Sequence, residues 1–279
     1  MNRELGLPWA GKGELFCRVW APETPRGAVA IVHGYGEHSG RYRDFSAWLS
    51  ERGWLVAACD LPGHGNSPGR RGHIRSFFDY LAAVDALLAE VRRAVPALVF
   101  LLGHSLGGLI AARYLEQGPQ AVAGLILSSP FFGLALPVPA WKRALARGLS
   151  RLWPALSLPS GIKPEDLSHD PQVVKAYRGD PLVHRVATAR WFTEISAAQA
   201  AALREAHRIS VPVLIIQGGE DRLTEVAATR RFAARCGTPD LTLRLYAGFY
   251  HETLNELGKA RVWQGLLSWL EERGGGRGG

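Results

Sequence analysis

One serine stands in a setting that suits nucleophilic chemistry. Ser105 is the third residue of the stretch GHSLG at positions 103–107, between an apolar, strand-like run at 97–102 and a helix-like run at 109–116. Strand, tight turn and helix is the arrangement in which a serine hydroxyl becomes an exposed nucleophile. The glycines allow a sharp turn without a Cβ clash, and the helix N-terminus offers N–H groups to a developing negative charge. Ser105 is therefore the candidate nucleophile.

The same G-x-S-x-G pattern occurs a second time, around Ser67 at positions 65–69. This copy lies in a loop rich in glycine and proline, and no helix-like run follows it directly. Pro68 also disfavours helical geometry for the residue before it, which is Ser67. The contexts of the two motifs favour Ser105 as the nucleophile.

A serine hydroxyl needs a base to take its proton and an acid to orient that base. Asp221 and His251 each follow a predicted strand, so both belong to the same sheet edge as Ser105. The order serine, aspartate, histidine is that of the α/β-hydrolases. Glu220 is an alternative acid one position earlier. The other histidines precede the acid near the first strands, or fall in or just after a long insertion: His33, His38, His64, His73, His104, His169, His184 and His207.

Acyl transfer also needs donors for the oxyanion of a tetrahedral intermediate. One predicted donor is the backbone N–H of Leu106, directly after the nucleophile. The second comes from the loop after the strand predicted at 28–33, where we expect the N–H of Tyr35, with Gly36 as the alternative. The histidines of these loops, His33 and His64, are expected to hydrogen-bond the backbone, because buried polar groups need partners.

The composition is that of a globular protein with a substantial core, at 279 residues with 47% hydrophobic and 21% charged residues. No apolar run reaches the roughly 18 residues that a membrane span needs. Residues 1–9 lack the apolar core of a signal peptide, so we expect a cytoplasmic protein. The three cysteines, Cys17, Cys59 and Cys236, are widely spaced, which predicts buried thiols rather than disulfides or a zinc site.

The net charge of +8 comes mostly from scattered arginines. Nucleic-acid binding would require a basic cluster within a recognisable module, and none is present in the sequence. The charge is compatible with a soluble basic protein. Attraction to an anionic membrane surface is the alternative.

Apolar strand-like runs alternate with amphipathic ones along most of the chain. Strands are predicted at 15–20, 28–33, 54–60, 97–102, 124–129, 213–217 and 241–246, and helices at 41–52, 76–93, 109–116, 225–236 and 257–272. Such alternation predicts an α/β fold with a mostly parallel central sheet and helices on both faces. We expect a core at residues 1–130 and 209–273, a cap at 131–208 and a disordered tail at 274–279.

The predicted cap interrupts the strand pattern and is expected over the carboxyl edge of the sheet, where ligands bind in such folds. Within it, residues 138–153 form a basic amphipathic helix, with no acidic residue. Its apolar positions are Trp141, Leu145, Leu149 and Leu152, and its basic ones are Lys142, Arg143, Arg147 and Arg151. This helix lies either on a membrane interface or against the enzyme body. Four apolar residues are candidates for lining an acyl tunnel, or for the core: Phe131, Phe132, Leu134 and Leu136.

Several longer motifs carry a family resemblance. They are HGYGEHSGRY at 33–42, DLPGHGNS at 60–67, LLGHSLGG at 101–108, DPL at 180–182, QGGEDR at 217–222 and YHE at 250–252. Together they resemble the monoacylglycerol lipase family of α/β-hydrolases, from about residue 15 to residue 270. The resemblance implies an α/β-hydrolase fold with a helical cap inserted after the sixth strand, an acyl-ester substrate, and neither metal nor cofactor. Carried over by position, it gives Ser105, Asp221 and His251 as the triad and Tyr35 and Leu106 as the oxyanion donors.

These observations predict a serine hydrolase that cleaves carboxylic esters of lipids through an acyl-enzyme, with monoacylglycerol as substrate and fatty acid and glycerol as products. Lysophospholipase, general carboxylesterase and a related aminopeptidase are alternatives on the same fold. A ligand-binding protein without catalysis is the alternative of a different class. Peripheral membrane contact is expected through residues 138–153, and no nucleic-acid partner is expected.

The nucleophile assignment makes a direct prediction. Replacing Ser105 with alanine removes the attacking oxygen, so kcat for ester hydrolysis should fall by several orders of magnitude. Initial rates of the purified variant and the parent protein on one ester measure this. Near-normal hydrolysis by Ser105→Ala would contradict the assignment.

Overall fold

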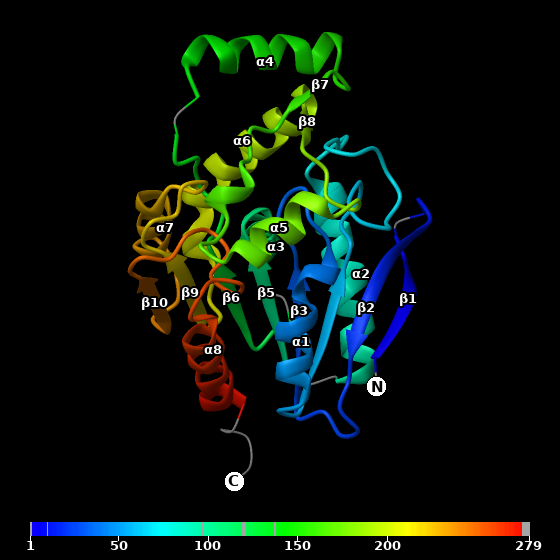
Figure 1. Cartoon of the computed structure of the whole chain (residues 1–279), viewed down its shortest axis with the longest axis vertical. Helices are drawn as coiled ribbons and strands as arrows, with labels where there is room; N and C mark the ends of the chain where they lie inside the picture. Colours follow the sequence, from blue (N-terminus) through cyan, green and yellow to red (C-terminus); the bar gives the residue numbers. More distant parts are fainter. Residues whose placement is uncertain (1, 10, 96–97, 119–120, 137, 275–279) are drawn as a thin grey trace.

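The computed structural model describes residues 2–9, 11–95, 98–118, 121–136 and 138–274. Over these residues the central element is an eight-stranded sheet in the order β1-β2-β4-β3-β5-β6-β9-β10 (Figure 1). Its strands are β1 (Asn2–Pro8), β2 (Glu14–Trp20), β3 (Gly27–Val32), β4 (Trp54–Cys59), β5 (Val99–His104), β6 (Gly124–Ser128), β9 (Val213–Gly218) and β10 (Leu241–Tyr246). The strands from β4 to β10 run parallel, while β1 and β2 pair antiparallel at one edge.

The parallel strands are continuous apolar segments because both of their faces are covered. Every residue of β3, β4, β5, β6 and β9 is buried. A strand buried on both faces has no need for alternating polar residues, which is why its sequence reads as an unbroken apolar run. Since these strands are parallel, their carboxyl ends all lie at one edge of the sheet.

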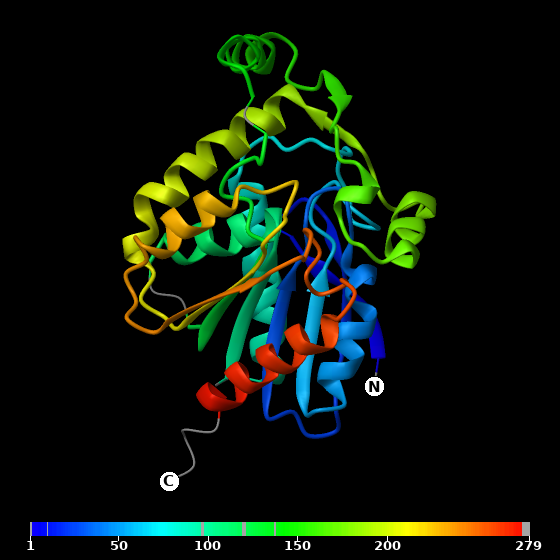
Figure 2. The same cartoon turned by 60° about the vertical axis from the view of Figure 1, so that its left-hand side comes forward.

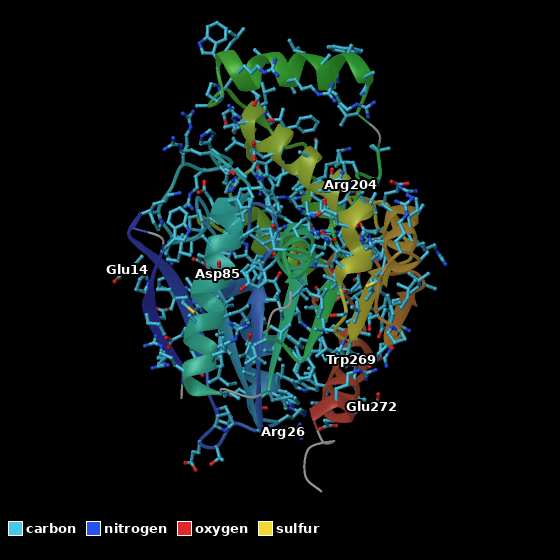
Figure 3. All side chains as sticks on the ribbon, turned by 180° about the vertical axis from the view of Figure 1, so that it is seen from behind. Glu14, Arg26, Asp85, Arg204, Trp269 and Glu272 are labelled. Atoms are coloured by element: carbon cyan, nitrogen blue, oxygen red, sulfur yellow. The ribbon has the colours of Figure 1, made fainter. Side chains whose placement is uncertain are left out.

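Two layers of helices cover the sheet. The helices α1 (Arg43–Ser50) and α8 (Lys259–Gly274) pack on one face, and α2 (Phe78–Ala94), α3 (Leu106–Leu115) and α7 (Val226–Ala233) on the other. In α2 the buried residues Tyr80, Val84, Leu87 and Val91 recur at helical spacing, so one stripe of the helix faces the core. Figure 3 shows α2, which carries Asp85, in front of the sheet. It also shows α8, with Trp269 and Glu272 labelled, at the lower end of the view.

The segment between β6 and β9 forms the cap over the carboxyl edge (Figures 1 and 2). It contains α4 (Ala140–Leu152), β7 (Ser157–Pro159), α5 (Pro171–Gly179), β8 (Val186–Thr188) and α6 (Ala189–Glu205). The helix α6 ties the cap to α2. Trp191 Nε1 donates to the Tyr80 hydroxyl at 3.1 Å, and Glu194 Oε2 accepts from the Phe77 N–H at 2.9 Å.

The structure corrects several boundaries. The edge strand β1 was not predicted, because most of its side chains are exposed and the sequence offers no apolar run there. The helix predicted from residue 41 is a 3-10 turn at Ser39–Tyr42 followed by α1. The cap also contains the antiparallel pair β7 and β8, which are too short to stand out in the sequence.

The ends of three further elements differ from the prediction. The strand β5 ends at His104, two residues later than predicted, so Ser105 follows it directly. The helix α2 begins at Phe78, and Ser76 Oγ accepts from the Phe78 N–H at 3.3 Å without being its N-cap residue. The disordered tail was predicted from residue 274, but Gly274 ends α8, and the rest of that tail, 275–279, lies outside the described residues.

Candidate active site

The turn between β5 and α3 holds Ser105 in a strained backbone conformation. Its φ of 52° and ψ of −115° lie in a region that residues other than glycine rarely adopt. The turn is tightly packed, since a Cβ added at Gly103 would overlap the Gly107 carbonyl and one at Gly107 would overlap the Val32 carbonyl. The Ser105 N–H donates to the Ser128 carbonyl of β6 at 2.9 Å. Ser105 remains partly exposed while the residues on either side are buried.

Asp221 and His251 meet beyond the ends of β9 and β10. His251 Nδ1 and Asp221 Oδ2 lie 2.8 Å apart, and both side chains are almost fully buried. Asp221 also accepts from the Thr224 hydroxyl at 2.6 Å, from the Thr224 N–H at 2.9 Å and from Gln217 Nε2 at 2.8 Å. Sequence reasoning did not identify Gln217 and Thr224. The carboxylate is therefore held in one orientation toward the imidazole.

The electrostatics of this pair suit a general base. Burial alone would raise the pKa of Asp221, but the charge and hydrogen bond of His251 and the donors on Thr224 lower it to about 2. Burial opposes the imidazolium of His251, yet the charge and hydrogen bond of Asp221 outweigh it and raise the pKa of His251 above its ordinary value of 6.5. The neighbouring His104 stays neutral at pH 7, because burial and then the charge of His251 lower its pKa to about 4.

The loop of His251 is fastened to the loop that follows β6, beside the serine turn. Ser129 Oγ donates to the His251 carbonyl at 2.7 Å, and Ser128 Oγ lies 3.1 Å from Thr253 Oγ1. The rings of His104 and His251 have centroids 4.9 Å apart. Among the described residues, no hydrogen bond joins Ser105 Oγ to His251. Such bonds are often long in enzymes without substrate and tighten in the complex.

The loop after β3 packs directly against the serine. A Cβ added at Gly34 would lie 3.2 Å from Ser105 Cβ. Neither the N–H of Tyr35 nor that of Leu106, the first residue of α3, has a protein acceptor in the part of the chain that the structure describes. Gly36, the alternative donor, has a φ of 77° and its carbonyl accepts from the His184 N–H of the cap. The Gly36 N–H likewise has no acceptor among the described residues, so this loop and Leu106 offer unpaired donors of the kind that an oxyanion hole requires.

The alternatives that the sequence offered lie outside the group formed by Ser105, Asp221 and His251. Ser67 is buried, donates to the Asp60 carbonyl at 2.5 Å and accepts from the Phe16 N–H. Glu220 is exposed, whereas the Asp221 side chain is buried against His251. The two loop histidines bond to backbone, His33 with the Leu61 N–H and His64 with the Pro62 carbonyl.

The four candidates for an acyl tunnel fall in different places. The Phe131 N–H donates to the Ser105 carbonyl at 2.9 Å, and Leu134 forms a bridge with Thr224. Phe132 is instead buried in the core, where its ring stacks on Phe232 at 4.1 Å. Leu136 is 79% exposed. Of the four, Phe131 contacts the backbone of Ser105, and Leu134 pairs with Thr224, which itself hydrogen-bonds Asp221.

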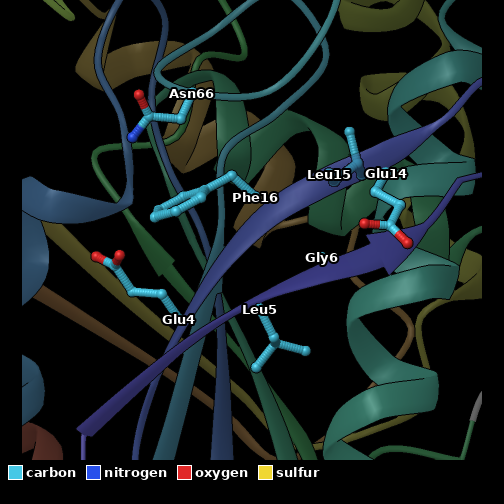
Figure 4. A pocket seen from close by; sticks show the side chains of 7 residues that line it. All are labelled: Glu4, Leu5, Gly6, Glu14, Leu15, Phe16 and Asn66. Carbon is cyan, nitrogen blue, oxygen red and sulfur yellow. The ribbon is translucent and has the colours of Figure 1, made fainter.

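Other features of the described residues offer no second site. A surface depression of about 360 Å³ over β1 and β2 contains no residue of the cluster, and Figure 4 shows the seven residues that line it: Glu4, Leu5, Gly6, Glu14, Leu15, Phe16 and Asn66. Within the described ranges, no group of three or more His, Cys, Asp or Glu side chains is arranged to hold a metal ion. None of the described helices has both the length and the apolar character needed to cross a bilayer.

The raised pKa of His251 predicts the pH dependence of catalysis. The base must be neutral, so kcat/KM should rise with pH through the pKa of His251, with its midpoint above 6.5. Replacing Asp221 with asparagine removes the charge that supports this pKa and the acceptor that orients the ring. The variant should lose about 10⁴ in kcat, and any residual acid limb should shift to lower pH. An unchanged profile in Asp221→Asn would refute the pairing.

Comparison with known proteins places this geometry in a family. The model of the family described as serine aminopeptidase, S33, matches residues 23–258. A monoacylglycerol lipase of Mycolicibacterium smegmatis is 34% identical and aligns over 90% of this chain and 91% of its own length. A phospholipase, YtpA, of Bacillus subtilis is 31% identical over 91% of this chain and 98% of its own length.

A solved structure agrees with these relatives. The crystal structure of the Paleococcus ferrophilus monoacylglycerol lipase superposes with a TM-score of 0.86 at 36% identity, over 93% of this chain and 99% of that one. The fold predicted from the sequence is confirmed, and the chain belongs to the monoacylglycerol lipase family of α/β-hydrolases.

Proposed function

We propose that the protein is a serine hydrolase of lipid carboxylic esters and that monoacylglycerol is its best substrate. One observation carries the proposal. The strained turn presents Ser105 at the carboxyl edge of the sheet, where a buried His251 and Asp221 pair lies beyond β9 and β10 and the centroid of the His251 ring is 4.9 Å from that of His104, the residue before the serine. Two relatives that are named as monoacylglycerol lipases, at 34% and 36% identity, support the choice of ester.

The reaction follows from the roles that these groups suit. His251 takes the proton of Ser105 as the serine oxygen attacks the ester carbonyl carbon. The N–H groups of Tyr35 and Leu106 stabilise the oxyanion. His251 then protonates the leaving glycerol oxygen, and an acyl-enzyme remains. Water enters, loses a proton to His251 and attacks the acyl carbon. His251 then gives this proton to the Ser105 oxygen as the bond to the acyl group breaks, which releases the fatty acid and restores the enzyme.

A lysophospholipid is the second candidate substrate. It offers the same acyl ester with an anionic or zwitterionic head group, and a net charge of +8 favours the approach of anionic lipids. The relative from Bacillus subtilis is named as a phospholipase.

A panel of substrates with one common acyl chain separates these candidates. We predict that kcat/KM is highest for the monoacylglycerol, lower by about tenfold or more for the lysophospholipid, and negligible for a proline arylamide, because discrimination by a pocket built for one head group is of this size. A p-nitrophenyl ester serves as the control that reports the intact triad. A preference for the lysophospholipid or the arylamide would reassign the substrate class.

We also propose that α4 docks the enzyme on a lipid surface. Ser150 is buried and lies 2.9 Å from Thr193 Oγ1 of α6, so this side of α4 faces α6. Trp141, Leu145 and Leu152 share the opposite side, because positions four and eleven residues apart recur on one face of a helix. All three are more than half exposed. Leu149, the fourth apolar position of the predicted stripe, is half-buried. The exposure of the other three supports a lipid surface over the alternative from the sequence, an apolar stripe packed on the enzyme body.

The basic residues of α4 complete an interfacial pattern. Lys142 and Arg151 flank the exposed apolar stripe, and the described helix contains no acidic residue. Apolar side chains would enter the boundary between head groups and acyl chains, while the cations meet anionic head groups. Figures 1 and 2 show α4 lying above α6 at the greatest distance from the sheet. A lipid surface bound by α4 would therefore lie on the side of the cap that faces away from the sheet.

Vesicle binding tests this docking. The triple variant Trp141→Ser, Leu145→Ser, Leu152→Ser should bind vesicles of phosphatidylcholine and phosphatidylglycerol at least about tenfold more weakly, because it loses the buried apolar area. Its rate on a water-soluble p-nitrophenyl ester should stay unchanged. Phe78→Ser is the matched control, since Phe78 is 69% exposed on α2. Equal vesicle binding by the triple variant and the parent protein would refute docking through α4.

A further inference from the structure

Three charged side chains are buried together beside the candidate active site. Arg41 Nε donates to Glu37 Oε2 at 3.0 Å, and Arg41 Nη2 donates to both carboxylate oxygens of Glu252 at 2.7 Å. The exposed fractions of the three side chains are 7%, 5% and 4% for Arg41, Glu37 and Glu252. One cation therefore lies between two anions in the protein interior, and none of the three has a role in the mechanism above.

Two members of this ion triad belong to loops of the site, Glu37 to the loop after β3 and Glu252 to the loop of His251. Glu37 Oε1 accepts from the Gly34 N–H at 2.5 Å and from the Tyr42 hydroxyl at 2.7 Å. Gly34 directly precedes Tyr35, one of the two candidate oxyanion donors. Glu252 directly follows His251. The ion triad of Arg41, Glu37 and Glu252 thus connects the loop after β3 with the loop of the catalytic base. These two segments are more than 200 positions apart in the sequence.

The ion triad also contacts the cap. The guanidinium of Arg41 lies 4.9 Å from the centre of the Tyr177 ring in α5, a cation–π contact. Beside it, His38 Nε2 lies 2.8 Å from Asp180 Oδ2, at the end of α5. Through Arg41 and Glu37, the cap is thus linked by direct contacts to the loop that contains Tyr35.

Stability alone is a weak reason for such a cluster. Desolvating three charges is costly, and apolar side chains of similar volume often replace a buried ion triad at no loss of stability. What apolar side chains cannot replace is the acceptor for the Gly34 N–H. That bond ties down the peptide before Tyr35, while the Tyr35 N–H itself has no protein acceptor among the described residues.

We propose that Glu37 is a positioning residue of the oxyanion hole, fixing the Gly34 N–H so that the Tyr35 N–H stays free for the oxyanion, and that Arg41 couples it to Glu252 and the His251 loop. This inference rests on the proposed serine hydrolase function. Glu37 touches no reacting atom and acts through the backbone of Gly34 and Tyr35.

Kinetics of Glu37 variants test the proposal. Glu37→Ala removes the acceptor, so kcat should fall about 30-fold or more while KM changes by less than about threefold, since loss of one oxyanion donor costs roughly 10² to 10³ in kcat. Glu37→Gln keeps an amide oxygen for the Gly34 N–H and should recover most of the loss. Tyr42→Phe leaves that acceptor in place and should lower kcat only slightly. Glu90→Gln is the matched control, because Glu90 is buried on α2 and bonded to Arg3 away from the site.

Binding of an alkyl boronic acid supplies a readout that a merely structural role would not move. A boronate on Ser105 mimics the tetrahedral intermediate and uses the oxyanion donors. Its Kd, measured by calorimetry, should rise in Glu37→Ala by about the factor by which kcat falls, and stay near the parent value in Glu90→Gln. Melting temperatures confirm that the variants are folded. If Glu37→Ala fails to fold, the boronate affinities of the three remaining proteins test the proposal. Affinity should decrease in the order parent, Tyr42→Phe, Glu37→Gln.

The pH profile tests the coupling through Glu252. The groups that face His251 are the carboxylates of Asp221, Glu252 and Glu37 and the neutral ring of His104, with Arg41 behind the two glutamates. Removing the charge of Glu252 in Glu252→Gln should move the acid limb of kcat/KM to lower pH, because a negative neighbour favours the imidazolium.

Two results would overturn the inference: a folded Glu37→Ala that keeps kcat and boronate affinity within about twofold of the parent, or a Glu90→Gln that loses both equally. Failure of the proposed function looks different. In that case the parent protein hydrolyses no lipid ester, while the boronate affinities still report whether Glu37 organises the site.

Discussion

The strained backbone at Ser105 is the constraint on which the rest of the site depends. A non-glycine residue at φ 52° costs on the order of 1–3 kcal/mol, and it persists only where its surroundings leave no alternative. Here the glycines at 103 and 107 allow carbonyls to approach where a side chain would collide, and β6 accepts the Ser105 N–H. The parallel sheet supplies this rigidity, because the turn directly follows β5, which lies between the fully buried strands β3 and β6.

The other parts of the site are arranged around this turn. Parallel strands end at one edge, so the loops after β9 and β10 bring Asp221 and His251 to the same side as the serine. The loop after β3 closes against Ser105 Cβ and is held from above by the cap, through the Gly36 carbonyl and the His184 N–H. The Tyr35 hydroxyl donates to the Val186 carbonyl of β8 in the same region. The cap therefore contacts the candidate oxyanion loop as well as covering it.

Much of this arrangement was predictable because local signals coincide with strand ends. Long apolar runs marked the parallel strands, and Asp221 and His251 stood out as polar residues directly beyond two of them. The features that were not predicted correctly have no local signal in the sequence. The edge strand β1 is mostly exposed, and Phe132 looks like a neighbour of Phe131 in sequence although the chain turns it into the core. Glu37, Arg41 and Glu252 were visible within motifs, but their mutual contacts join distant segments, which spacing along the chain does not reveal.

The central claim is that one serine, Ser105, is the nucleophile. The most direct measurement is peptide mapping by mass spectrometry after reaction of the intact protein with a fluorophosphonate. The account predicts one adduct per chain, on the peptide that contains Ser105, and no adduct on the peptide that contains Ser67. An unmodified protein, or an adduct on Ser67 or another serine, would contradict it.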